Sequence, residues 1–153
     1  MTPASPDRPA LERAAVALGF AGLLPQMAAV ALLLGDVPIA TAAAFGYALL
    51  ILSFLGGIWW GFAMHRRGDA TQGRLALLAV VPNLVAFAIL LAATVTGHVE
   101  WGLVATGSAI LLTLPVDRML VRRGDAPADW MRLRVPLSVG LGALTILAGA
   151  LSA

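Results

Sequence analysis

The stretch from Phe45 to Met64 constrains this chain more than any other feature of its sequence. It holds twenty consecutive residues without a charged side chain. At about 1.5 Å of rise per residue, a helix of this length crosses the roughly 30 Å hydrocarbon core of a bilayer. Composition agrees, since 60% of the residues are hydrophobic and 12% are charged, whereas soluble domains average roughly 45–50% and about 25%. The chain is therefore predicted to be an integral membrane protein.

Four further apolar segments are long enough to cross a membrane, so we expect an all-α protein that forms a five-helix transmembrane bundle. Residues 1–13 are a polar tail, and residues 14–153 are expected to fold as one transmembrane domain. A signal peptide is the alternative for the first span, but its apolar segment exceeds the usual length of about 7–15 residues. The expected spans cover approximately residues 14–34, 41–64, 75–96, 101–120 and 135–153.

The ten arginines predict the orientation of the bundle. They lie in the N-terminal tail, between the second and third spans, and around the connection of the fourth and fifth spans. Five crossings put these regions on one side, and positively charged connections are retained in the cytoplasm. We expect a cytoplasmic N-terminus, a C-terminus outside, and a bacterial cytoplasmic (inner) membrane as the location. The aromatic belts at the two interfaces are expected to contain Trp59, Trp60, Trp101 and Trp130.

A helical wheel of the second span separates small side chains from bulky ones. Gly46, Ser53, Gly57 and Gly61 lie on one side, and Leu55 lies on the opposite side. Small residues let membrane helices approach closely. We therefore predict that this small side packs against neighbouring helices and that the opposite side faces lipid. Such a seam fits a compact bundle; association with a membrane protein partner or a second copy is the alternative.

Two spans carry a proline followed by a carboxamide, as Pro25-Gln26 and Pro82-Asn83. A proline leaves one helix carbonyl without its donor, which is costly in hydrocarbon. Gln26 and Asn83 are expected either to bond to such carbonyls or, together with Ser53, to line a ligand pocket between the first three spans. Both interpretations remain open from the sequence.

Asp117 lies inside the fourth span, near its cytoplasmic end, four residues after Thr113. An acidic residue in a membrane helix is a functional candidate by default. At this depth, the favoured interpretation is an ion pair that joins the fourth and fifth spans, with Arg132 or Arg134 as the partner and Arg66 as a further possibility.

Several site types lack support in the sequence. The chain has no cysteine, which excludes disulfides and thiolate metal sites. His65 and His98 are expected at opposite membrane faces, so they cannot both ligate one haem. We expect no catalytic residues, no metal, no cofactor and no enzymatic activity. The pI near 10.4 reflects arginines in short connections, so we expect no nucleic-acid partner.

The second span also carries a recognisable signature. The signature consists of Tyr47, residues 51–58, Trp60 and Gly61. Supporting positions in the other parts of the chain are Leu18, Gly19, Gly22, Pro25, Pro82, Asp117, Trp130, Arg132, Leu133 and Arg134. This pattern resembles the domain of unknown function 3429 family, whose animal members are called transmembrane protein 69. The resemblance implies a small multi-span protein of bacterial or mitochondrial inner membranes without established chemistry. The chain departs from it at Trp59, where many members have histidine, and at Gln26, where they have an aromatic residue.

Two functional hypotheses follow. The first is a non-enzymatic accessory, assembly or scaffold protein that packs through its glycine seams. The alternative is a binding or transport protein for a small hydrophobic ligand such as a quinone, a porphyrin or a lipid. A filled bundle favours the first hypothesis, whereas a pocket of about 300 Å³ or more with convergent polar groups favours the second.

Overall fold

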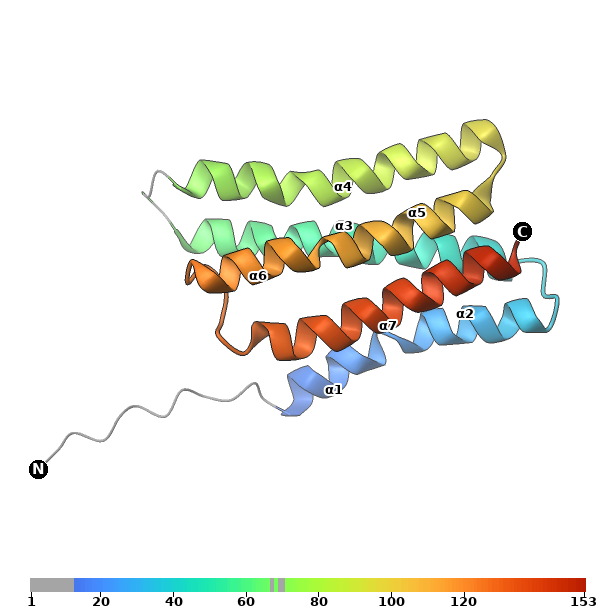
Figure 1. Cartoon of the computed structure of the whole chain (residues 1–153), viewed down its shortest axis with the longest axis horizontal. Helices are drawn as coiled ribbons and strands as arrows, with labels where there is room; N and C mark the ends of the chain where they lie inside the picture. The colour runs from blue at the N-terminus through green and yellow to red at the C-terminus, as the bar shows by residue number, and fades with distance from the viewer. Residues whose placement is uncertain (1–12, 67, 69–70) are drawn as a thin grey trace, which may run out of the picture.

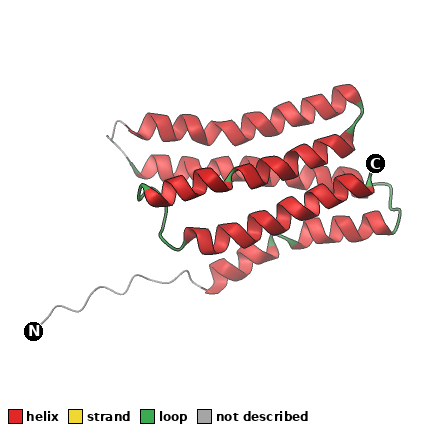
Figure 2. Ribbon diagram, in the orientation of Figure 1, coloured by secondary structure: helices red, strands yellow, loops and turns green. Residues whose placement is uncertain are grey.

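The computed structural model of the chain describes residues 13–66, 68 and 71–153, and helices joined by short loops make up this part of the protein (Figure 2). The helices run side by side along the long axis of the molecule (Figure 1). In chain order they are α1 (Arg13–Ala21), α2 (Leu24–Leu34), α3 (Ala40–His65), α4 (Thr71–Thr96), α5 (Val99–Leu112), α6 (Leu114–Arg122) and α7 (Trp130–Leu151).

These helices form five segments that are long and apolar enough to span a membrane, because α1 with α2 and α5 with α6 each make one interrupted span. The predicted five-helix transmembrane bundle is thus confirmed. The last turn of α3 and the loop between α6 and α7 lie at the end where α1 begins, and the C-terminus lies at the opposite end (Figure 1). We call the former the arginine end, since Arg66, Arg122 and Arg123 are there. Which compartment it faces stays a prediction.

Proline explains both interruptions. The break between α1 and α2 falls at Gly22, just before Pro25 in the first turn of α2. The hydroxyl of Tyr47, on α3, donates a hydrogen bond to the carbonyl oxygen of Gly22, so a neighbouring helix supplies the donor that the break removes. The break between α5 and α6 likewise precedes Pro115. In contrast, α4 continues through Pro82.

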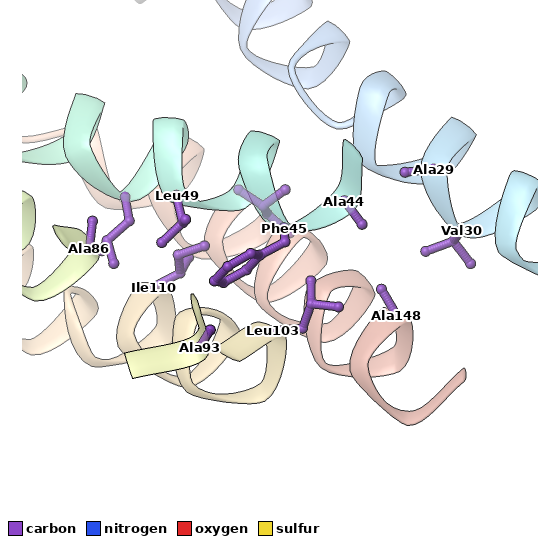
Figure 3. Packing of buried hydrophobic residues seen from close by; sticks show 12 residues of the cluster. Ala29, Val30, Ala44, Phe45, Leu49, Ala86, Ala93, Leu103, Ile110 and Ala148 are labelled. Carbon is purple, nitrogen blue, oxygen red and sulfur yellow. The ribbon is translucent and has the colours of Figure 1, made fainter. Parts of the chain in front are cut away.

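The larger buried cluster is centred on Phe45 of α3. Its ring points between Leu103 and Ile110 of α5 and Ala93 of α4 (Figure 3). A Cβ atom at Gly102 would lie 2.9 Å from the ring, so the missing side chain there makes room for it. The outward surface of the bundle is rich in large exposed apolar side chains, as contact with acyl chains requires.

Glycines set the closest helix contacts. A Cβ atom at Gly107 of α5 would lie 2.7 Å from the carbonyl oxygen of Gly142 of α7. On the other side of the bundle, a Cβ atom at Gly56 of α3 would overlap the carbonyl oxygen of Ala79 of α4. Backbones can approach this closely only where no side chain intervenes.

The packing side predicted for the second span is wrong within this bundle. A Cβ atom built at Gly46, Gly57 or Gly61 would lie more than 4 Å from every other described helix. Leu55, which the wheel placed toward lipid, is only 4% exposed. The helix uses Gly56 rather than Gly57 against α4, which rotates the packed side by about 100°. Because lipid is as apolar as a helix interface, small residues alone do not reveal which side is packed.

Candidate functional site

Asp117 lies at the centre of a buried polar network near the arginine end. One carboxylate oxygen, Oδ1, accepts hydrogen bonds from Nε1 of Trp59 at 2.9 Å and from Nε1 of Trp130 at 3.0 Å. The other, Oδ2, accepts from Nε of Arg134 at 2.8 Å. The side chains of Asp117 and Arg134 are 0% and 5% exposed. The carboxylate therefore has three donors and one counter-charge, as a buried ion requires.

Arg134 extends the network into the bundle. Its Nη1 donates to the Ser138 hydroxyl at 2.6 Å and its Nη2 to the Thr113 hydroxyl at 2.9 Å. The Thr113 hydroxyl in turn donates to the carbonyl oxygen of Ile110 at 2.6 Å, beside the break between α5 and α6. A guanidinium has five N–H groups, so one hydrogen on each terminal nitrogen remains after these contacts. The Asp117 network comprises Trp59, Thr113, Asp117, Trp130, Arg134 and Ser138.

Of the partners predicted for Asp117, the structure brings Arg134 to it. Arg132 is exposed and lies 3.6 Å from an aspartate carboxylate three residues earlier. Two residues apart on a helix, the two arginines point about 200° apart, so only one of them faces the bundle. Arg66 forms an ion pair with Asp125, in the loop between α6 and α7.

Two tryptophans correct the predicted aromatic belt. Trp59 and Trp130 turn their indole nitrogens to Asp117, and Trp59 is buried. Trp60 and Trp101 are 46% and 68% exposed, as residues of an interfacial belt are. Sequence reasoning missed the inward pair because position along a span gives depth but not direction. The available signal was Asp117 itself, since a carboxylate in a span needs donors at its own depth.

A cavity of about 390 Å³ lies beside the Asp117 network, between α1, α3 and α7. Its walls are apolar, and its polar lining consists of Trp130, Arg134 and Ser138. At its rim, Leu18 of α1 and Phe54 of α3 are largely exposed. The cavity therefore opens sideways, toward the acyl chains of a surrounding bilayer.

The chemistry of the cavity is set by its polar end. The charges of Asp117 and Arg134 cancel, so this end offers N–H and O–H donors without a net charge. Such a surface suits a neutral hydrogen-bond acceptor better than a carboxylate or a phosphate. No histidine, methionine, cysteine or tyrosine lines the cavity in the described part of the chain, and no group of three or more metal-binding side chains occurs among the described residues.

The three residues predicted to share a ligand pocket do not meet. Gln26 is fully buried, and its Nε2 donates to the hydroxyl of Thr145 on α7 at 3.2 Å. Ser53 and Asn83 line a different, outward-facing groove between α3 and α4. The prediction is wrong because α2 packs against α3 and α7, whereas α4 packs against α3 and α5. The observed cavity accordingly lies between the first, second and fifth spans.

A family model described as "Protein of unknown function (DUF3429)" matches residues 11–150. The matched range contains the whole Asp117 network and every residue that lines the cavity. No curated protein and no solved structure matches the chain.

Proposed function

We propose that this chain, which belongs to the family of proteins of unknown function DUF3429, binds a small hydrophobic molecule in the cavity between α1, α3 and α7. The family description names no activity, so the proposal is argued from the geometry of the cavity. One observation carries the proposal: an apolar cavity of about 390 Å³ that ends in buried donors. Ligand pockets typically measure about 300–1,000 Å³, with apolar walls and a few polar groups that orient the ligand.

We propose that the ligand is neutral and carries a carbonyl-type acceptor, as a quinone or the ester region of a lipid does. The acceptor would face Arg134 and Ser138, and the apolar body would lie against leucine and isoleucine side chains. The lateral opening supports entry from the bilayer. A haem fits less well, because the described lining supplies no axial ligand.

We further propose that the protein binds or carries this molecule without transforming it. The two carboxylate oxygens of Asp117 already accept three hydrogen bonds within the protein, and Asp117 does not line the cavity. The proposed location is the bacterial cytoplasmic membrane, with the arginine end in the cytoplasm.

The test is to purify the protein in a mild detergent and identify bound lipophiles by mass spectrometry. Ile58→Trp puts a large ring into the cavity wall. Leu77→Trp is the matched control, since Leu77 is 74% exposed on α4. We expect an acceptor-bearing lipophile in stoichiometric amount with the wild type and with Leu77→Trp, and its loss from Ile58→Trp. Equal amounts in both variants, or only bulk lipid with the wild type, would overturn the proposal.

A second candidate is an accessory, assembly or scaffold role in which the chain docks on another membrane protein. The observation that favours it is the unpartnered side of α3, where a Cβ atom built at Gly57 or Gly61 would meet no other described helix within 4 Å. If a different protein occupies this side, Gly57→Leu should release it from a complex in native membrane extracts, while Ile58→Trp should not.

A further inference from the structure

We infer that the groove between α3 and α4 is an interface at which two copies of this chain associate in the membrane. The groove measures about 550 Å³ and shares no lining residue with the ligand cavity, so the inference is independent of the proposed function. It starts from two polar side chains, Ser53 and Asn83, that lie in this otherwise apolar surface.

Neither of these side chains has a hydrogen-bond partner in the described part of the chain. The other described serine and threonine side chains all have polar partners. Thr94, for example, is exposed on the same helix as Asn83, but its hydroxyl donates to the carbonyl oxygen of Leu90 at 2.8 Å. Among the described serine and threonine side chains, Ser53 is thus the exception, and the carboxamide of Asn83 likewise lacks a partner in the described part of the chain.

Their depth makes the missing partners costly. Ser53 lies near the middle of α3 (Ala40–His65), and Asn83 lies near the middle of α4 (Thr71–Thr96). Each is about 18–20 Å from either end of its helix at 1.5 Å per residue. Water and lipid headgroups do not reach this depth, and acyl chains offer no hydrogen bonds. Whatever fills the groove must bring a polar group to the middle of the membrane.

A second copy meets this requirement. Copies in one bilayer share one topology, so their two-fold axis runs along the membrane normal, and equivalent residues meet at equal depth. A carboxamide is both donor and acceptor, so Asn83 can pair with the Asn83 of its copy. The lining of the groove carries no charge, which avoids repulsion between like groups. A Cβ atom at Gly46, in the groove wall, would lie more than 4 Å from every other described helix, so the exposed Phe87 of a copy can approach closely there.

The experiment measures energy transfer between donor-labelled and acceptor-labelled protein in liposomes over a range of lipid dilutions. The variants are Asn83→Leu, the conservative Asn83→Gln, and Thr94→Val as a control that removes a polar group already bonded within its helix. We expect the wild type, Asn83→Gln and Thr94→Val to associate alike. Asn83→Leu should weaken association about 3- to 20-fold, the range measured for polar contacts between membrane helices.

Asn83 is exposed in the single chain, so Asn83→Leu should leave the fold intact, which the helical circular dichroism spectrum checks. A wild type that stays monomeric at every dilution overturns the inference, and so does unchanged association of Asn83→Leu. A small molecule that co-purifies only when Asn83 is present, without energy transfer, would assign the groove to a ligand instead. Loss of the cavity ligand in Ile58→Trp, with energy transfer unchanged, would separate this interface from the proposed function.

Discussion

Removal of one charge from the Asp117–Arg134 pair should destabilise the protein far more than the loss of the hydrogen bonds of that side chain alone would. Asp117→Asn keeps the shape of the side chain but leaves the guanidinium of Arg134, 5% exposed, without a counter-charge. Breaking a buried pair in this way costs about 3–5 kcal/mol. Arg134→Met in turn leaves the carboxylate of Asp117 without a counter-charge, and we expect a similar loss in the free energy of unfolding.

In the double variant Asp117→Asn, Arg134→Met, the free energy of unfolding should fall by much less than the sum of the losses in the two single variants. Without ions, the remaining cost comes mainly from Ser138 and Thr113, which lose the donors that Arg134 supplies. Lost hydrogen bonds of this kind cost about 1–3 kcal/mol together. The coupling energy between the two positions should therefore reach at least about 2 kcal/mol.

The assay is unfolding in mixed micelles with increasing dodecyl sulfate, followed by tryptophan fluorescence. Trp59 and Trp130 report directly, since both indoles bond to Asp117. Arg132→Gln is the control: its ion pair is exposed, so the change in the free energy of unfolding should stay below about 1 kcal/mol. Additive single losses, or a loss below about 1 kcal/mol for Asp117→Asn, would refute the reasoning.

Three further outcomes are expected. Gly56→Ala should lower the free energy of unfolding by about 1–3 kcal/mol, because the added methyl group clashes with α4. In the same assay with monomeric protein, Gly57→Ala should change it by less than about 0.5 kcal/mol. Equal effects of the two variants would contradict the packing of α3. Tyr47→Phe leaves the Gly22 carbonyl without its donor and should lower the free energy of unfolding by about 1–3 kcal/mol, so an unchanged unfolding midpoint would mean that another group meets this carbonyl. Topology reporters at the C-terminus and in the loop between α6 and α7 should give opposite locations, with the loop in the cytoplasm; matching signals would exclude five crossings.

The number of spans and their approximate extent could be predicted from the sequence because length and charge decide them. A segment without charges either spans the bilayer or stays exposed at great cost, and the arginines fall where spans end. Pro25 and Pro115 lie just after the two breaks, since proline cannot donate the helical hydrogen bond, but Pro82 and Pro136 lie inside continuous helices, so proline marks a position where a break can occur. These signals are local, and no knowledge of neighbouring helices is needed to interpret them.

The facing of the helices could not be predicted in the same way. In water, the buried side of a helix is the apolar side, but in lipid both sides are apolar. Gly56 and Gly57 are chemically identical neighbours, yet a Cβ atom at Gly56 would meet α4, whereas one at Gly57 would meet no other described helix within 4 Å. For the same reason, the inward orientation of Trp59 could not be predicted. Gln26 and Asn83 are expected from the sequence to share one pocket, although they lie on opposite sides of α3. Only Asp117 could reveal direction, because an ion in a span must find its counter-charge.

The Asp117–Arg134 pair also bears on how the protein reaches the membrane. The fourth span carries an acid and the fifth carries a base, and each would enter the hydrocarbon alone at a cost of up to about 2.5–3.5 kcal/mol. Paired, the two charges neutralise each other before they leave water. Biogenesis should therefore deliver the last two spans as a hairpin, held at the insertion machinery until the final helix has emerged from the ribosome.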